Sequence, residues 1–362
     1  MIQDIHFVNV KYHGEQVGRL SVGTKSECLF EYDKDWLAHG FSISPLHLPL
    51  KTGIFSADYQ PFNGNFGIFE DSLPGGYGEY LLRKVLAKQG IDYWSLTVVQ
   101  RLSIVGNSGM GALCYVPETK VMVSEAQPSF DDMQRIALEV LSERTDEQAD
   151  MLYFKSGNSG GVRPKCLYTD DEGHWMVKFR HTYDPQDIGE IEYRYNVAAR
   201  SCGIDVPDFK LISGKYFAEK RFDIENGVRL HVATASALLN EPISPPKMDY
   251  HSLLQLTGFL TQSLEAVEQQ FRRMAFNVYA RNYDDHARNF SFICRDGQWS
   301  LAPAYDLTND RTLGEHATTA NFNGLPTDHD MITVGKNAHI SDTRCKEILE
   351  EVKAGIGDLN TE

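Results

Sequence analysis

The feature that most constrains this sequence is the order in which four polar residues follow one another along the chain. Lys178 interrupts the apolar run WMVKF, and Asp284 is followed five residues later by Asn289 in the stretch ARNYDDHARNF. Asp306 closes the alternating run WSLAPAYD, which predicts a strand that ends at this acid. Because an ammonium group inside an apolar strand is costly unless it is paired, we expect the fold to give Lys178 a charged partner.

The spacing of the three oxygen-bearing residues is the one that protein kinases use: an Asp-x4-Asn loop and, about twenty residues later, an Asp at the end of a strand. In that arrangement Asp284 accepts the proton of the attacking hydroxyl, and Asn289 and Asp306 hold Mg²⁺, which prefers oxygen ligands. Asp285 competes for the role of base, but Asn289 follows it by four positions rather than the five of the Asp-x4-Asn spacing. We therefore favour Asp284.

A simpler interpretation is that NYDDHARN is a solvated turn whose Asp and Asn side chains bond to the local backbone. The string alone is equally compatible with this, and a single histidine such as His286 is more often structural than catalytic. Asp306 counts against the simple turn, because it follows an alternating run farther along the chain.

A phosphate site requires a loop that lets backbone N–H groups approach an anion, and a cation. The stretch SGNSGGVRPK, residues 156–165, supplies glycines at 157, 160 and 161, although it matches neither common glycine-rich phosphate motif. A plain surface turn is the alternative for such a cluster. Lys178 follows in a predicted strand, and Glu192 on the next predicted helix is its expected partner, as in protein kinases.

The pattern along the chain predicts an α+β protein of three parts with boundaries at 1–120, 121–224 and 225–362. The predicted strands cover 10–22 (two strands around a turn), 27–32, 173–181 and 216–224, and the predicted helices cover 78–90, 131–143, 191–203 and 269–282. In the last helix Phe271, Met274, Ala275 and Val278 recur at the spacing of one buried face.

The composition narrows the class of protein. The net charge of −15 repels phosphate backbones, so stand-alone nucleic-acid binding is not expected. No apolar run is long enough to span a membrane, and MIQDIHFVNV lacks the apolar stretch of a secretory signal. The six cysteines are scattered without metal-finger spacing, which favours a reducing cytoplasm.

With these residues in view, the sequence resembles the HipA family of bacterial toxin serine/threonine kinases. NYDDHARNFSF is similar to the family's catalytic block, LAPAYDL to its metal-binding strand end and GGVRPK to its phosphate loop. DSLPGGYGEYLL and SIVGNSGMGALCYVP resemble its amino-terminal subdomain. The resemblance, over roughly 60 to 310, implies a two-lobed protein kinase-like fold with a strand-rich N-terminal subdomain and a mainly helical C-lobe.

The resemblance also assigns roles to individual residues. It implies Asp284 as the proton acceptor and places Asn289 and Asp306 on Mg²⁺ beside ATP. It places the remaining nucleotide contacts at Gly160, Gly161, Val162, Arg163, Lys165 and Lys178 for the phosphates, Lys220 and Phe222 at the hinge beside adenine, and His286 and Tyr305 at the border of the nucleotide.

Two departures from the family pattern concern regulation and charge. Several relatives phosphorylate a serine in the phosphate loop and so silence themselves; that position is Asn158 here, with Ser156 and Ser159 as neighbours. Arg288 stands where lysine is common, which keeps the charge but changes its reach. The serine usually phosphorylated is thus absent from its position, and Ser156 or Ser159 is the alternative phosphoacceptor in this loop.

The resemblance implies a helix-turn-helix antitoxin of the HipB type as partner, with DNA contacted only through it. It implies a translation component, such as an aminoacyl-tRNA synthetase, as the phosphorylated protein. Two alternatives remain open: a kinase of this fold that acts on a small molecule or lipid, and a catalytically silent nucleotide-binding partner of a DNA-binding antitoxin.

Overall fold

The computed structural model describes residues 2–120, 128–157, 160–309 and 314–360, and the chain divides into two compact units. The first unit comprises Met1–Gly189 and Ile212–Val232, and the second comprises Glu190–Leu211 and Ala233–Glu362. The three boundaries expected from the sequence remain a prediction.

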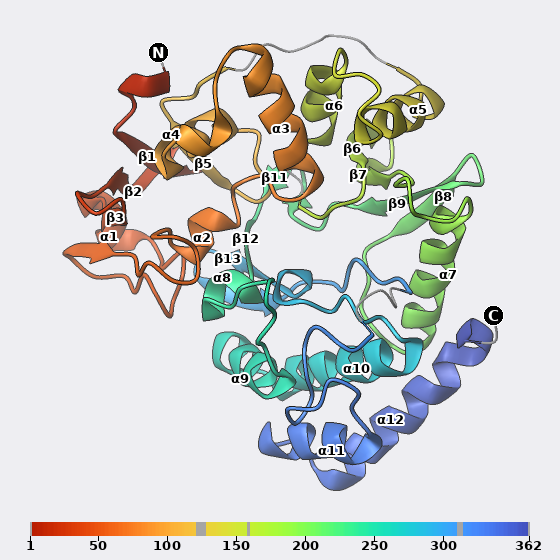
Figure 1. Ribbon diagram of the computed structural model, residues 1–362. Helices are drawn as coiled ribbons and strands as arrows, with labels where there is room; N and C mark the ends of the chain where they lie inside the picture. The colour runs from red at the N-terminus through yellow and green to blue at the C-terminus, as the bar shows by residue number, and fades with distance from the viewer. Residues whose placement is uncertain (1, 121–127, 158–159, 310–313, 361–362) are drawn as a thin grey trace. The chain divides into compact units, whose positions relative to one another are not determined.

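The amino-terminal part of the first unit is built on a five-stranded antiparallel sheet with the order β4-β3-β2-β1-β5 (Figure 1). The strands are β1 (Phe7–Tyr12), β2 (Glu15–Val22), β3 (Cys28–Tyr32), β4 (Ile54–Ser56) and β5 (Leu113–Val116). The helices of this part are α1 (Lys34–His39), α2 (Gly67–Glu70), α3 (Tyr77–Lys88) and α4 (Val98–Val105). The strands predicted at 10–22 and 27–32 are confirmed.

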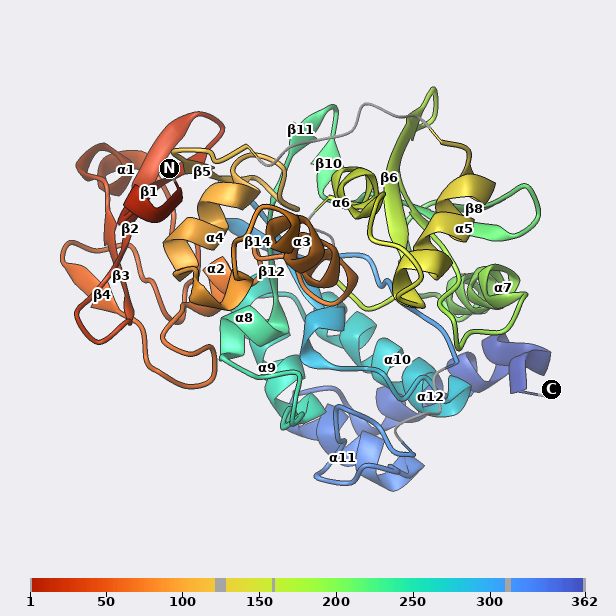
Figure 2. The same cartoon turned by 45° about the horizontal axis from the view of Figure 1, so that its top comes forward.

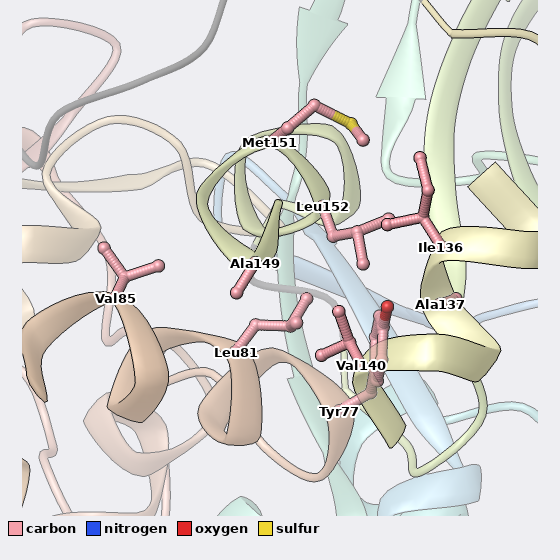
Figure 3. Close-up of a cluster of buried hydrophobic side chains, with 9 residues drawn as sticks. All are labelled: Tyr77, Leu81, Val85, Ile136, Ala137, Val140, Ala149, Met151 and Leu152. Carbon is pink, nitrogen blue, oxygen red and sulfur yellow. The ribbon is translucent and has the colours of Figure 1, made fainter. Parts of the chain in front are cut away.

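Three helices of the first unit share one apolar cluster (Figure 3). They are α3, α5 (Phe130–Leu141) and α6 (Ala149–Ser156). Figure 3 shows Leu81 of α3, Val140 of α5 and Leu152 of α6 close together within this cluster. The helices predicted at 78–90 and 131–143 are thus confirmed, the second starting after Ser129, whose hydroxyl caps it by accepting the N–H of Asp132.

A second sheet has the strand order β6-β7-β9-β8. Its strands are β6 (Lys165–Asp170), β7 (Gly173–Lys178), β8 (Phe209–Ile212) and β9 (Tyr216–Lys220). One face of β6, β7 and β9, which we call the helix face, packs against Met133 and Phe130 of α5 and carries Cys166, Trp175, Val177, Tyr216 and Ala218. The register gives the opposite face, the lysine face, to Lys165, Leu167, Met176, Lys178, Phe217 and Glu219.

Two further β structures are a short hairpin and a small sheet. The hairpin consists of β10 (Ile224–Glu225) and β11 (Val228–Arg229). The three-stranded sheet has the order β12-β13-β14, with β12 at His231–Thr234, β13 at Ser291–Arg295 and β14 at Gln298–Leu301. The strand expected to reach Asp306 ends at Leu301, because Pro303 has no N–H to continue the ladder.

The second unit is mainly helical. Its helices are α7 (Ile188–Ser201), which begins at the border of the units, α8 (Ala235–Leu239), α9 (Tyr250–Thr261), α10 (Leu264–Ala280), α11 (Asp328–Asn337) and α12 (Asp342–Ile356). Figures 1 and 2 show α9, α11 and α12 against α10. Because α10 is contacted from several sides, it buries Arg272, Arg273, Phe276 and Asn277 as well as the predicted apolar stripe, and Val278 of that stripe is only half-buried. Within the described ranges, no helix combines the length and the apolar character needed to cross a membrane.

Candidate functional site

Gly157 and residues 160–164 of the predicted phosphate loop lie between α6 and β6 in the first unit, beside the lysine face. Gly157 and Gly161 have positive φ values of +58° and +84°, and the position of a Cβ on Gly157 would be 3.0 Å from the side chain of Leu167. The carbonyl oxygen of Gly161 accepts the N–H of Tyr77, at the start of α3, at 2.9 Å. A Cβ on Gly76 would collide with that oxygen, so the close approach of α3 requires glycine there.

Of the two serines and the asparagine in this loop, only Ser156 lies within the described residues. Ser156 is fully buried, and its hydroxyl donates to the carbonyl oxygen of Tyr153 at 3.1 Å. Asn158 and Ser159 lie outside the described residues. The Ser156 hydroxyl therefore stabilises the carboxyl-terminal end of α6. The expected effect of Asn158 on self-phosphorylation stays a prediction.

Two lysines stand directly opposite each other at the end of the second sheet. Lys165 of β6 pairs with Lys178 of β7 in the register, and both are at least nine-tenths buried. The ammonium group of Lys165 donates to the carbonyl oxygen of Gly160, which draws the loop toward the lysine face. Like charges at opposed positions repel each other, so an anion held by this face would stabilise it.

Glu219 supplies a carboxylate to the lysine face. Its Oε1 lies 3.8 Å from Nζ of Lys178, and Lys178 also lies 5.6 Å from the ring centre of Phe217. The order of residues along the chain predicts Glu192 in this role. Glu192 is buried on α7 in the second unit, so its pairing with Lys178 remains a prediction.

The other phosphate-loop residues differ in exposure and in partners. Arg163 donates its Nε to both carboxylate oxygens of the buried Asp184, at 3.2 Å and 3.1 Å. Val162 is exposed. Arg163 is thus held in a fixed orientation by a carboxylate that the sequence did not reveal.

The two residues expected at the hinge lie at and just beyond the end of β9. Lys220 pairs with Trp175 in the register and projects to the helix face, with its ammonium group 5.9 Å from the Trp175 ring centre. Phe222 is half-buried. Since Lys178 projects to the opposite face, a nucleotide on the lysine face would meet Lys220 through its backbone.

In the second unit the neighbouring acids Asp284 and Asp285 have opposite environments. Asp285 is 1% exposed and accepts hydrogen bonds from the Tyr250 hydroxyl at 2.7 Å and the Thr318 N–H at 3.1 Å, and Nδ1 of His316 lies 3.0 Å from it. Burial first, and then the Asp285 carboxylate, raise the pKa of Tyr250 well above its ordinary value, so this hydroxyl remains a donor. The side chain of Asp284 is 40% exposed.

Asn289 and His286 lie in the same loop as Asp284. Nδ2 of Asn289 donates to the backbone carbonyl oxygen of Asp284 at 2.7 Å, which leaves Oδ1 as the amide atom that can accept or coordinate. Nε2 of His286 lies 3.9 Å from Oδ1 of Asp284. The short helical turn Ala287–Asn289 therefore fixes the asparagine relative to the predicted base.

Asp306 follows a segment that is fastened to this loop. The Tyr305 hydroxyl donates to the Arg288 carbonyl oxygen at 2.5 Å and lies 2.6 Å from the Ser291 hydroxyl. Arg273 of α10, which is buried, donates to the carbonyl oxygen of Ala302 at 2.7 Å. Burial lowers the pKa of Arg273 to about 10, so it stays a cation at neutral pH.

The backbone of Asp306 has an unusual conformation. Its φ is +56°, a left-handed value that Asp and Asn tolerate better than most residues. Strained backbone of this kind persists where the surroundings determine it, and it often occurs at functional positions.

The donor set fits a particular kind of metal site. Asp284, Asn289 and Asp306 offer only oxygen atoms, and among the residues with assigned positions no group of three or more His, Cys, Asp or Glu side chains could hold a metal ion. Mg²⁺ is held by one or two carboxylates together with water and phosphate oxygens, so it does not need a protein cage. These residues fit Mg²⁺ and do not resemble a zinc site.

Two family models match the sequence. The HipA N-terminal domain matches residues 8–116, and the HipA-like C-terminal domain matches residues 157–358, which is more than half of the chain. The chain belongs to the HipA family. The family predicted from the sequence is thereby confirmed.

Individual relatives of this HipA-family chain are distant. Toxin YjjJ of Escherichia coli K12 is 28% identical over 165 residues, which cover 41% of this chain and 37% of that protein. A chain of the Shewanella oneidensis MR-1 complex of HipA, HipB and operator DNA has a TM-score of 0.72 at 17% identity and covers 97% of this chain and 90% of its own length. This similarity confirms the α+β, two-lobed kinase-like fold with a strand-rich N-terminal subdomain and a mainly helical C-lobe.

Several residues that position the site of this HipA-family protein are not evident from the sequence motifs. Glu219 could have been identified from the sequence, because it is a charged residue between Ala218 and Lys220 in a strand that is mostly buried. Asp184 and Arg273 gave no local signal, because their partners lie in other segments of the chain. The same holds for Tyr250 and the other partners of Asp285.

Proposed function

We propose that this protein is an ATP- and Mg²⁺-dependent serine/threonine protein kinase and the toxin of a toxin–antitoxin pair. The observation that carries the proposal is the contrast between Asp284 and Asp285. Asp285 is buried and occupied by hydrogen bonds, whereas Asp284 is accessible and has the amide of Asn289 fixed beside its backbone. An accessible carboxylate on a rigid loop is what a proton acceptor for a hydroxyl substrate requires.

Each half of the reaction is assigned to residues of one unit. Gly160, Gly161, Lys165 and Lys178 of the first unit bind the phosphates of ATP, with Arg163 beside them. Asn289 and Asp306 of the second unit hold Mg²⁺, which neutralises phosphate charge when it is bound. Lys220 and Phe222 border adenine, and His286 and Tyr305 border the nucleotide.

The transfer itself moves one phosphoryl group and one proton. The serine or threonine oxygen of the acceptor forms a bond to the γ-phosphorus while the bond from that phosphorus to the oxygen of ADP breaks. Asp284 takes the proton of the acceptor hydroxyl. The remaining residues contribute by positioning and by charge neutralisation, which account for most of the catalysis in reactions of this kind.

The relatives support the biological context of the proposal. The Shewanella HipA was solved together with HipB and operator DNA, and YjjJ is named a toxin. We therefore assign this protein a HipB-like helix-turn-helix antitoxin, with DNA contacted through it, and a translation component such as an aminoacyl-tRNA synthetase as a substrate. Its six cysteines are free thiols, which supports a cytoplasmic location.

The test is phosphate transfer from γ-labelled ATP by the purified full-length chain to bacterial proteins, with phosphoamino-acid analysis of the product. Asp284→Asn should lower the rate by about 10² to 10⁴-fold, because it removes the proton acceptor. Asp296→Asn, at an exposed turn of the same unit, is the matched control and should retain wild-type transfer. Wild-type transfer by the Asp284 variant would refute the assignment, and label on a small molecule or lipid alone would refute the protein-kinase activity.

A further inference from the structure

A tight turn in the second unit presents an aromatic side chain to solvent. Phe322 is 81% exposed, more than any other large apolar side chain in the described part of the chain, and Leu325 three residues later is 57% exposed. We call residues 320–327 the Phe322 loop. The ring of Phe322 lies 5.9 Å from that of His251 and does not contribute to the core.

The backbone of this loop is strained where the aromatic residue is placed. Asn321 and Phe322 have φ values of +54° and +61°. Asparagine accepts a left-handed conformation readily, but a bulky residue such as phenylalanine does so rarely. A glycine would relieve the strain, so Phe322 occupies both an unfavourable backbone conformation and an unfavourable, exposed environment.

The carboxylates of Asp249 and Asp330 hold the loop in this conformation by accepting hydrogen bonds from it. Asp249 is 6% exposed, and its Oδ2 accepts the N–H of Phe322 at 2.7 Å. Asp330 accepts the side-chain amides of Asn321 and Asn323 at 2.9 Å and 3.1 Å and the N–H of Thr327 at 2.9 Å. The aromatic side chain therefore stands on a rigid support and loses little conformational entropy when a partner binds it.

The loop is also connected to the segment that carries the predicted base. Thr318 donates its N–H to Asp285, and the N–H of Ala317 donates to the carbonyl oxygen of Tyr283 at 2.9 Å. Phe322 follows Thr318 by four positions, and a chain of that length spans at most about 14 Å. A partner bound to Phe322 is thus held near Asp284, which is next to Asp285.

The charge around the loop indicates the chemistry of the partner. Residues 314–335 contain the acids Glu315, Asp328 and Asp330 and no lysine or arginine. Because Asp328 is paired with Lys353 at 2.8 Å, the unbalanced negative charge comes from Glu315 and Asp330. Glu315 lies against the turn, because a Cβ on Gly324 would contact its side chain. Such surroundings attract a positively charged surface and repel a free anion such as a nucleotide or a sugar phosphate.

We propose that the Phe322 loop is the docking contact for the protein substrate, which meets it with an apolar pocket bordered by basic residues. This inference rests on the proposed kinase activity and specifies its substrate class as a folded protein. Exposed aromatic residues on rigid supports are typical of the few positions that dominate a protein–protein interface.

The experiment compares three variants of the full-length chain, using proteins of a dialysed bacterial lysate as acceptors and γ-labelled ATP as the donor. Phe322→Ala removes the ring, and Phe322→Gly removes the ring and also relieves the left-handed backbone, so its thermal midpoint should stay within about 3 °C of wild type. Phe259→Ala is the matched control, because Phe259 is 57% exposed on α9 of the same unit. ATP affinity is measured in parallel without acceptor.

The expected result is a loss of about tenfold or more in labelling of acceptor proteins for both Phe322 variants, with ATP affinity within about twofold of wild type. Phe259→Ala should label acceptors as wild type does. Undiminished labelling by the Phe322 variants overturns the docking contact, and so does loss of antitoxin binding without loss of labelling. A wild-type chain that binds ATP but labels no protein overturns the substrate class, and one that does not bind ATP refutes the proposed function as well.

Discussion

On the lysine face of the first unit, two positive side chains are buried opposite each other. On the loop of the second unit that begins at Tyr283, two neighbouring carboxylates are separated by burial. The register of β6 and β7 places Lys165 against Lys178 whether or not an anion is present. In the acidic loop, Asp285 turns inward to three partners and Asp284 remains accessible.

The difference shows two ways of preparing a site for a charged ligand. The lysine face holds like charges together, so the binding of an anion should raise the free energy of unfolding of the protein. The acidic loop divides its charges, so one carboxylate supports the fold and the other is available for chemistry. The following experiments test whether the two regions respond differently to substitution, pH and nucleotide.

The largest effect is expected at Asp306. Asp306→Asn keeps a residue that tolerates φ of +56° and removes one negative charge, so the fold should be retained while metal-dependent transfer falls by roughly 10³-fold. The measurement is the initial rate of phosphate transfer against Mg²⁺ concentration, with circular dichroism as the control of folding. A rate within about tenfold of wild type at saturating Mg²⁺ would exclude Asp306 as a metal ligand.

The first unit should also respond to acid through His231. Burial lowers the pKa of His231 to about 4, below the ordinary value of 6.5, and a ring nitrogen lies 2.8 Å from the Ile43 carbonyl oxygen. Because the unfolded chain binds the proton first, this contribution to stability is present above pH 6.5 and is lost as the pH falls toward 4, by about 3 kcal/mol in total.

Urea unfolding at several pH values checks this expectation. His231→Gln can keep a donor for Ile43 but does not titrate, so its stability should change less between pH 6.5 and pH 4 than that of the wild type. Equal pH dependence for the two proteins would show that His231 is not the source of the acid sensitivity.

Substitutions of Asp285 and Asp284 should have different effects on the free energy of unfolding. Asp285→Asn weakens charge-assisted hydrogen bonds in a buried network, so the free energy of unfolding should fall by about 2 kcal/mol. Asp284→Asn should change it by no more than about 0.5 kcal/mol, because the side chain is partly exposed. Equal destabilisation by the two substitutions would mean that both acids are structural.

The smallest effect is expected at the lysine face. Lys165→Met removes one of two opposed ammonium groups, so ATP affinity should fall about tenfold while the stability of the free protein does not decrease. Isothermal titration with ATP and Mg²⁺ measures the affinity, and Lys25→Met at an exposed position is the control. An unchanged affinity would remove Lys165 from the phosphate site.

Features set by local sequence were predictable. The strands within 10–22 and 27–32 and the helices near 78–90 and 131–143 follow from apolar periodicity, which depends on neighbouring residues. The choice of Asp284 over Asp285 as the base rests on spacing alone and stays a prediction; the structure shows Asp285 buried and the Asp284 side chain 40% exposed.

Features set by distant contacts were not predictable from one sequence. The partner of Lys178 found in its own unit is Glu219, and this depends on the register between β7 and β9, which no local pattern fixes. Phe271, Met274 and Ala275 of the stripe predicted for α10 are buried, but the burial of its other faces was not predictable, because it comes from contacts with α9, α11 and α12. The strand predicted to reach Asp306 is too long. It ends at Leu301, because Pro303 has no N–H to continue the ladder.

The hydrogen bond from Tyr77 to Gly161 ties the phosphate loop to a helix of the amino-terminal part of the chain. A shortened protein that starts after residue 120 would keep the loop glycines and both opposed lysines, yet it would lack this anchor. The amino-terminal part therefore supports the loop of the proposed nucleotide site, and truncation experiments that remove it would report on an altered loop.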